Sequence, residues 1–306
     1  MPVSLQYFSS TMSPFGVAHC FLLNILSLVI VTCQRLSVYG DVPGLAPSPH
    51  YQIEVREKGA DKWLKPFTHL TECTAETFCN FTGHFEFLHD WSNSYINIEM
   101  KEGVEVEFKI TKLDGNSITK AVVHPKASAT ECNVKDDKAF VTINKPTLFT
   151  VDINGQMDDQ DTGRLPHNQG TYDGPPIHTL TIFANPFISK PDLTDPGVYQ
   201  LPPGQVAPSE GPWHTLHFLP GIHDIGMEFR VHSNKSYYIP GDALVYGTLT
   251  NWEPHGGNNV RIYGHGTLSG DRLPHPKSTE SPESEYWKFR PVCLSGKLDS
   301  LVFSCK

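Results

Sequence analysis

One glycine-rich stretch constrains the fold more than any other part of the chain: NNVRIYGHGTLSGD, residues 258 to 271. Three glycines interrupt it, yet its apolar residues keep the spacing of extended chain. Related pieces precede it, since FLPGIHDIG aligns with YIPGDALVYG, and YGTLTN aligns with HGTLSG. A short apolar strand followed by glycine thus recurs every ~20 residues, which is typical of a parallel β-solenoid. An antiparallel meander that repeats Gly-Thr-Leu is the alternative.

The region before this repeat has the alternating pattern of antiparallel strands. In INIEMKEGVEVEFKI, residues 96 to 110, apolar and polar residues alternate on both sides of Lys-Glu-Gly. Similar runs are FVTIN, TLFTVDI and HTLTIFA, at 140 to 144, 147 to 153 and 178 to 184. Short strands at this spacing predict a β-sandwich with one buried and one solvated face.

Composition supports an all-β protein and excludes one class of partner. The 306 residues include 24 glycines and 25 prolines, and only 19% are charged, which favours a turn-rich β fold. The net charge is −9 and no Lys/Arg cluster occurs, which argues against a nucleic-acid partner. Neither a CxxC pair nor an HExxH motif is present, so we expect no metal and no cofactor.

The N-terminal segment indicates export. Residues 21 to 33, FLLNILSLVIVTC, have the length of a signal-peptide core and are short for a membrane span. No Lys or Arg precedes this core, so an uncleaved anchor, which would hold the protein at a membrane, is the alternative. Residues 1 to 40 are therefore interpreted as a signal peptide or anchor of a secreted, extracellular, monomeric protein.

Cysteines and sequons agree with an oxidising compartment. A disulfide among Cys73, Cys79 and Cys132 is expected, without a choice of pair. Asn80 and Asn234 each begin an N-glycosylation sequon and would be acceptors there.

A change of composition divides the chain. Proline recurs from residue 186 to 213, which predicts a stiff connection without strand pairing. We therefore expect a sandwich domain at 45 to 190, a Pro-rich connection at 191 to 213 and the repeat region at 214 to 306.

The order of these pieces resembles the N-terminal half of family-49 glycoside hydrolases, the dextranase and isopullulanase group. The resemblance covers about residues 90 to 296 and is carried by IFANPF, FLPGIHDIG, YIPG and VRIYGHGTLSGD. It implies an antiparallel β-sandwich followed by the first coils of a right-handed, pectin-lyase-like parallel β-helix. It also implies inverting endo-hydrolysis of an α-glucan by the full-length family. The family's catalytic aspartates lie in later coils, so we expect a truncated, inactive fragment without catalytic residues.

The residues present offer weaker candidates. Asp242 and Asp271 each adjoin a glycine, where Asp is ordinarily a turn residue. Trp213, Trp252 and Trp287 are candidates for stacking on sugar rings, although core packing explains them equally well.

Two functions remain open from the sequence. The chain is either part of a polysaccharide-active glycoside hydrolase or a non-catalytic extracellular carbohydrate-binding or structural β-protein. The partner expected in either case is a polysaccharide, with α-glucan implied by the resemblance and pectin-type uronans not excluded by the scaffold.

Overall fold

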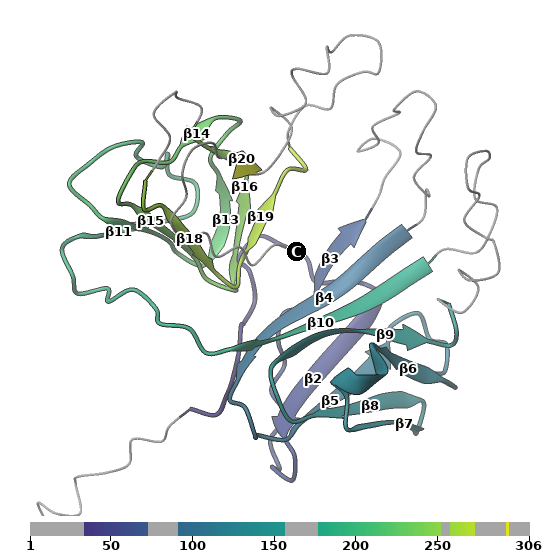
Figure 1. Ribbon diagram of the computed structural model, residues 1–306. Helices are drawn as coiled ribbons and strands as arrows, with labels where there is room; N and C mark the ends of the chain where they lie inside the picture. Colours follow the sequence, from purple (N-terminus) through teal and green to yellow (C-terminus); the bar gives the residue numbers. More distant parts are fainter. Residues whose placement is uncertain (1–33, 73–90, 157–176, 252–257, 273–291, 294–306) are drawn as a thin grey trace, which may run out of the picture. The chain divides into compact units, whose positions relative to one another are not determined.

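The computed structural model describes residues 34–72, 91–156, 177–251, 258–272 and 292–293, and its elements are almost all strands (Figure 1). A short 3-10 helix, η1 (Lys126–Ser128), is the helix found among these residues. Residues 1 to 34 separate from the rest as a unit of their own, and the described elements belong to the second unit, Arg35–Lys306. No helix among the described residues is long and apolar enough to cross a membrane.

Two sheets built from the first ten strands share one core. The first sheet has the order β1-β4-β10-β9-β6, and β3 pairs with the edge of β4 that β1 also uses. The second has the order β2-β5-β8-β7. The bounds are β1 (Leu36–Val38), β2 (Tyr51–Glu57), β3 (His69–Glu72), β4 (Trp91–Met100), β5 (Val106–Lys112), β6 (Ala121–His124), β7 (Glu131–Lys135), β8 (Lys138–Ile143), β9 (Thr147–Ile153) and β10 (Ile177–Pro186).

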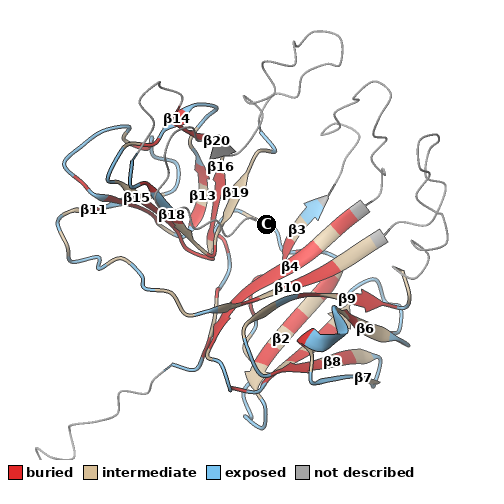
Figure 2. Cartoon of the chain, in the orientation of Figure 1, coloured by how far each residue is buried: buried red, intermediate tan, exposed pale blue. Residues whose placement is uncertain are grey.

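The predicted alternation places these strands as expected. Ile96, Ile98 and Phe108 are fully buried in the cluster that both sheets share, together with Val141 and Ile182. All pairings are antiparallel except that of β4 with β10, which is parallel over ten residues. Apolar side chains at every second position therefore hold the two sheets together, as antiparallel strand patterns require (Figure 2).

The second face of β4 departs from the prediction of a solvated side. Asn97 and Glu99, which alternate with the core residues, are themselves buried. On β10, Phe183 is half-buried, and so is Phe187 beyond the strand. This face of β4 is covered by residues from other segments of the chain, and that cover makes the site described below.

The remaining strands form three small parallel sheets. Their orders are β11-β12-β15-β18, β13-β16-β19 and β14-β17-β20. Each of three successive stretches thus contributes one strand to each of the three sheets (Figure 1). The bounds are β11 (Val198–Leu201), β12 (Thr215–Phe218), β13 (Gly221–Asp224), β14 (Phe229–Arg230), β15 (Ser236–Ile239), β16 (Ala243–Tyr246), β17 (Leu249–Thr250), β18 (Arg261–Gly264), β19 (Thr267–Ser269) and β20 (Val292–Cys293).

The pairing is parallel, as the repeat predicted, but its register differs from the sequence alignment by one residue. His217 pairs with Tyr238, so Phe218 lies opposite Ile239 rather than Tyr238 when the pairing of β12 with β15 is continued by one residue. A shift of one residue exchanges inward and outward side chains. The column Leu219, Ile239 and Ile262, which the alignment predicts, is therefore wrong. The inward column is Leu216, Tyr237 and Ile262.

The two Gly-Thr-Leu pieces, which align in sequence, also belong to different sheets. Leu249 belongs to β17, in the sheet with β14, whereas Leu268 belongs to β19, in the sheet with β16. A further difference concerns the Pro-rich stretch, because Val198–Leu201 within it forms β11 and pairs with β12. Strand pairing begins earlier than the prolines suggested because this strand contains none of them.

Glycine is required where one coil crosses the turn of the coil before it. Gly264 has a φ of +127°, and a Cβ there would lie 2.6 Å from the backbone carbonyl carbon of Ile239. Gly266, two residues later, donates its N–H to the Ile239 carbonyl at 2.9 Å. The glycine-rich motif at 258 to 271 is therefore a point of close backbone approach between successive coils.

Candidate functional site

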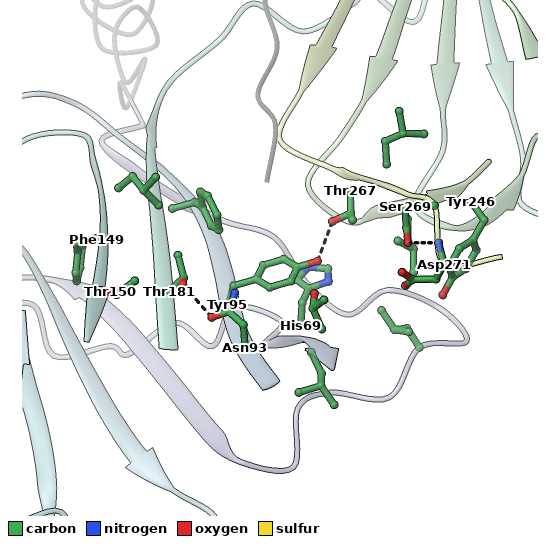
Figure 3. A pocket seen from close by; sticks show the side chains of 18 of the residues that line it. His69, Asn93, Tyr95, Phe149, Thr150, Thr181, Tyr246, Thr267, Ser269 and Asp271 are labelled. Carbon is green, nitrogen blue, oxygen red and sulfur yellow. Dashed lines mark hydrogen bonds between the residues drawn. The ribbon is translucent and has the colours of Figure 1, made fainter. Parts of the chain in front are cut away.

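A pocket of about 720 Å³ is formed by β3, β4, β9 and β10 together with β16 and the segment around β19 (Figure 3). Its lining combines apolar, aromatic and polar side chains, with one carboxylate among the described residues. The lining residues are Leu45, His69, Leu70, Thr71, Asn93, Tyr95, His124, Pro125, Leu148, Phe149, Thr150, Thr181, Phe183, Leu244, Tyr246, Thr267, Leu268, Ser269, Gly270 and Asp271. Ligand pockets commonly have this mixture of apolar walls and a few polar groups.

Tyr95 anchors one side of the pocket. Its ring stacks on His69 with centroids 4.7 Å apart, and it meets Phe183 edge-on at 6.0 Å. Its hydroxyl lies 3.0 Å from the Thr267 Oγ1, which links β4 to β19 (Figure 3). Burial raises the pKa of the Tyr95 hydroxyl, which therefore stays protonated at neutral pH. The contacts hold the ring in one orientation.

Asn93 supplies a polar group on the same face. Its Oδ1 accepts hydrogen bonds from the Thr181 hydroxyl at 2.9 Å and from the Thr179 hydroxyl at 3.0 Å. Both partners come from β10, which is paired in parallel with β4. The Asn93 Nδ2 group has no hydrogen-bond partner among the described residues, so its hydrogens can donate to a ligand.

The opposite side of the pocket carries Tyr246, Ser269 and Asp271. The Ser269 hydroxyl accepts the Asp271 N–H at 3.2 Å. Arg272 does not line the pocket, since its guanidinium stacks on the Tyr246 ring at 4.0 Å and pairs with Asp224 at 2.9 Å. Among the described lining residues, Asp271 is the one carboxylate, and none is a lysine or arginine.

A second, buried group of polar side chains lies farther along β4, around Glu99. The side chain of Glu99 is fully buried, its Oε2 lies 3.2 Å from the Lys190 Nζ and its Oε1 lies 3.4 Å from the His265 Nε2. The backbone N–H of Ile188 donates to Oε1 at 3.4 Å. Burial alone would raise the pKa of Glu99, but the contacts with His265 and Lys190 outweigh it and lower the pKa.

Of the three tryptophans considered for sugar stacking, Trp213 lies among the described residues, and its position does not support that role. Trp213 is buried in the core of the coils, meets Tyr237 edge-on at 5.9 Å and has the Lys235 ammonium over its ring. It is a core residue, so that candidate is wrong. Trp252 and Trp287 lie outside the described residues.

The remaining predicted residues are only partly described. Asn234 is exposed in a turn and its Oδ1 accepts from the Asn259 Nδ2 at 3.2 Å. Cys132 is exposed and forms no disulfide with a described residue, whereas Asn80, Cys73 and Cys79 lie outside the described residues. No group of three His, Cys, Asp or Glu side chains that could hold a metal ion occurs in the described part of the chain.

The two aspartates weighed in the sequence are not brought together in the pocket. Asp271 lines it, whereas Asp242 lies in the turn after β15, and burial raises the pKa of that carboxyl. Sequence reasoning missed Asn93, Tyr95 and Phe183. The outward positions of β4 and β10 carry aromatic and amide side chains, but this local pattern does not reveal which segment covers that face.

Comparisons with known proteins bear on the fold. The sequence matches no protein-family model, and it matches no curated protein. Among solved structures, Dex49A from Penicillium minioluteum resembles this chain, with a TM-score of 0.56 at 17% sequence identity. The similarity covers 77% of this chain and 48% of Dex49A, so the chain spans about half the length of that protein. At this identity the likeness concerns the fold.

Proposed function

We propose that the chain is part of a polysaccharide-active protein of the family-49 glycoside hydrolase type, and that its pocket binds a neutral polysaccharide, an α-glucan. In this proposal the two core-sharing sheets are an antiparallel β-sandwich, and the three parallel sheets are the first coils of a right-handed parallel β-helix. The sequence resemblance and the likeness in fold to Dex49A, a dextranase, support it. Its domains are a sandwich to about residue 190, a connection to 213, and coils beyond.

The chemistry of the pocket is the observation that carries the binding function. Sugars present apolar C–H faces and many hydroxyls, and the pocket offers the Phe183 and Tyr246 rings beside amide, hydroxyl and carboxylate groups. A uronan would bring carboxylates toward Asp271 without a lysine or arginine in the described lining to neutralise them. The lining therefore favours neutral over acidic polysaccharides.

We expect the full chain to bind isomaltohexaose, maltohexaose or both at pH 7, and to bind oligogalacturonate of the same length at least tenfold more weakly. Isothermal titration calorimetry measures all three. Asp271→Asn should narrow this difference by improving oligogalacturonate binding. Equal affinity of the unchanged protein for neutral and acidic oligosaccharides would overturn the proposed specificity.

A substitution in the pocket gives a second expected result. Phe183→Ala removes a half-buried ring from the lining and should weaken binding of the neutral oligosaccharide roughly fivefold, about 1 kcal/mol. Tyr199→Ala is the matched control, because Tyr199 is exposed on β11 and does not line the pocket. Loss of affinity in both variants, or in neither, would argue against this pocket as the sugar site.

Hydrolysis is not expected from the described residues. An inverting hydrolase needs an acid and a base, two carboxyl groups about 6.5 to 9.5 Å apart. The described lining supplies only Asp271. We expect the 306-residue chain to release no reducing ends from dextran or pullulan above the background of a buffer control. Release that disappears in Asp271→Asn would contradict this expectation.

The same proposal places the protein outside the cell, with a glycan on Asn234 and a disulfide among Cys73, Cys79 and Cys132. The exposed position of Asn234 in a turn supports the glycan. The Asn234 Oδ1 accepts a hydrogen bond, and the Nδ2 that would carry the sugar bonds to no described residue. Secretion from eukaryotic cells, followed by a mass shift on glycosidase treatment that Asn234→Gln abolishes, is the expected result. A secreted chain without a glycan at Asn234 would contradict it.

A further inference from the structure

Two contacts join β4 to the segment that forms the coil side of the pocket. Tyr95 and Glu99 lie four residues apart on the same face of β4, and they meet Thr267 and His265, which are separated only by Gly266. The first contact lies in the pocket. The second lies outside its lining and is buried, since the side-chain exposures of His265 and Glu99 are 6% and 0%.

Among the described residues, four charged or titratable groups interact with Glu99. Lys190 follows β10, His265 lies between β18 and β19, and Tyr39 follows β1. Tyr238 on β15 is the fourth, and Asp242, after that strand, interacts with Lys190. The contacts with Lys190 and His265 have ion-pair length without hydrogen-bond alignment, which makes the attraction depend on the charge of Glu99.

Lys190 and Tyr39 tie further segments to this group. The Lys190 ammonium lies 5.6 Å from the Tyr39 ring centroid, and the Tyr39 ring meets His265 edge-on at 6.2 Å. Tyr39 also covers Gly241 so closely that a Cβ there would overlap the ring. The Glu99 carboxylate therefore holds together three segments: the one after β1, the one after β10 and the one between β18 and β19.

We infer that the Glu99 carboxylate is a positioning residue for the pocket, holding the His265–Thr267 segment against β4, so that sugar binding is lost when this carboxylate is neutralised by acid. This inference rests on the proposed function, because it concerns regulation of that same pocket. Glu99 does not touch the sugar; it acts through His265 on the Thr267 side of the site.

The direction of the pH effect follows from the neighbours of Glu99. Its pKa in the folded protein lies below the ordinary carboxyl value, so the ionised group is fully present above that ordinary value. The contribution is lost as the pH falls through the lowered pKa. We therefore expect affinity for the neutral oligosaccharide to fall as the pH drops through the lowered pKa of Glu99, which lies below the ordinary carboxyl value of 4.5.

The test uses the full chain with Lys190→Met, because Lys190 is half-exposed and its replacement should leave the fold intact. Removing the cation raises the pKa of Glu99, so the acid loss of isomaltohexaose binding should begin at higher pH, with affinity about threefold weaker than wild type at pH 4. Glu99→Gln should bind about tenfold more weakly at pH 7 and lose the acid dependence. Lys58→Met is the control, since Lys58 pairs with Glu131 at 2.8 Å on the second sheet.

Hydrogen–deuterium exchange of residues 258 to 272, corrected for the intrinsic effect of pH, provides a readout without sugar. The inference is supported if the acid loss of isomaltohexaose binding begins at higher pH in Lys190→Met than in wild type, and at the wild-type pH in Lys58→Met. If sugar binds at pH 7 but the acid loss of binding begins at the same pH in Lys190→Met as in wild type, the inference is overturned, while the proposed function is unaffected. If no sugar binds at pH 7, the proposed function fails, but the exchange measurement still tests the Glu99 contact. A shift to higher pH, in Lys190→Met, of the point at which residues 258 to 272 lose protection from exchange supports that contact. The same pH for this loss in Lys190→Met and wild type overturns it.

Discussion

Gly264→Ala is expected to destabilise the protein by about 3 kcal/mol or more. Two costs combine at this position. The φ of +127° is one that side-chain-bearing residues rarely adopt, and the added methyl would overlap the carbonyl of Ile239 in the preceding coil. Backbone atoms cannot move aside as the end of a flexible side chain can, so the coils must separate locally.

Urea denaturation followed by circular dichroism measures this effect, with Gly40→Ala as its control. Gly40 is also a glycine of the same unit, but a Cβ there would have no atom within 4 Å. The control should stay within about 0.5 kcal/mol of wild type. Equal stabilities of the two variants would mean that the coils do not approach each other at Gly264 as described.

Tyr237→Ala is expected to cost about 3 to 5 kcal/mol, the range for removing a large aromatic side chain from a core. Tyr237 is fully buried, and its ring meets Trp213 and Phe229 edge-on with centroids 5.9 and 6.0 Å away. Its hydroxyl accepts the His232 N–H at 3.0 Å, and burial raises the pKa of Tyr237 to about 12.

Two further variants separate packing from hydrogen bonding. Tyr237→Phe keeps the ring and loses the contact with His232, which should cost about 1 kcal/mol. Tyr199→Ala removes a tyrosine that is 37% exposed on the edge strand β11 and should cost less than about 0.5 kcal/mol. If Tyr237→Ala were as stable as Tyr199→Ala, the inward column of Leu216, Tyr237 and Ile262 would be wrong.

The antiparallel strands could be predicted from the sequence because their pattern is local. Alternation around Ile96, Phe108 and Ile182 requires only that one face of each strand be covered. Parallel pairing was also predicted, since a repeat of strand and glycine favours it over the antiparallel alternative. The register was not, because Pro-Gly occurs at 220 to 221 and 240 to 241, one residue out of step with the pairing of β12 with β15 and two with that of β13 with β16.

The candidate site was not predictable from local patterns. Asn93 and Tyr95 look like ordinary outward residues of a strand, and Asp271 looks like a turn residue. Their meeting depends on which segment covers the second face of β4, and contacts such as Tyr95 to Thr267 span 172 positions of the sequence. The prediction that Trp213 stacks on sugar was wrong for a related reason, because an isolated tryptophan in a sequence does not show whether a core surrounds it.

A crystal structure of the full chain with bound isomaltohexaose tests the central claim most directly. We predict glucose units in the pocket in contact with Phe183 and Tyr246, accepting a hydrogen bond from the Asn93 Nδ2 and donating to the Asp271 carboxylate. Soaking with oligogalacturonate should leave the same pocket without sugar. Glucose units bound only elsewhere, with this pocket empty at saturating isomaltohexaose, would contradict the account.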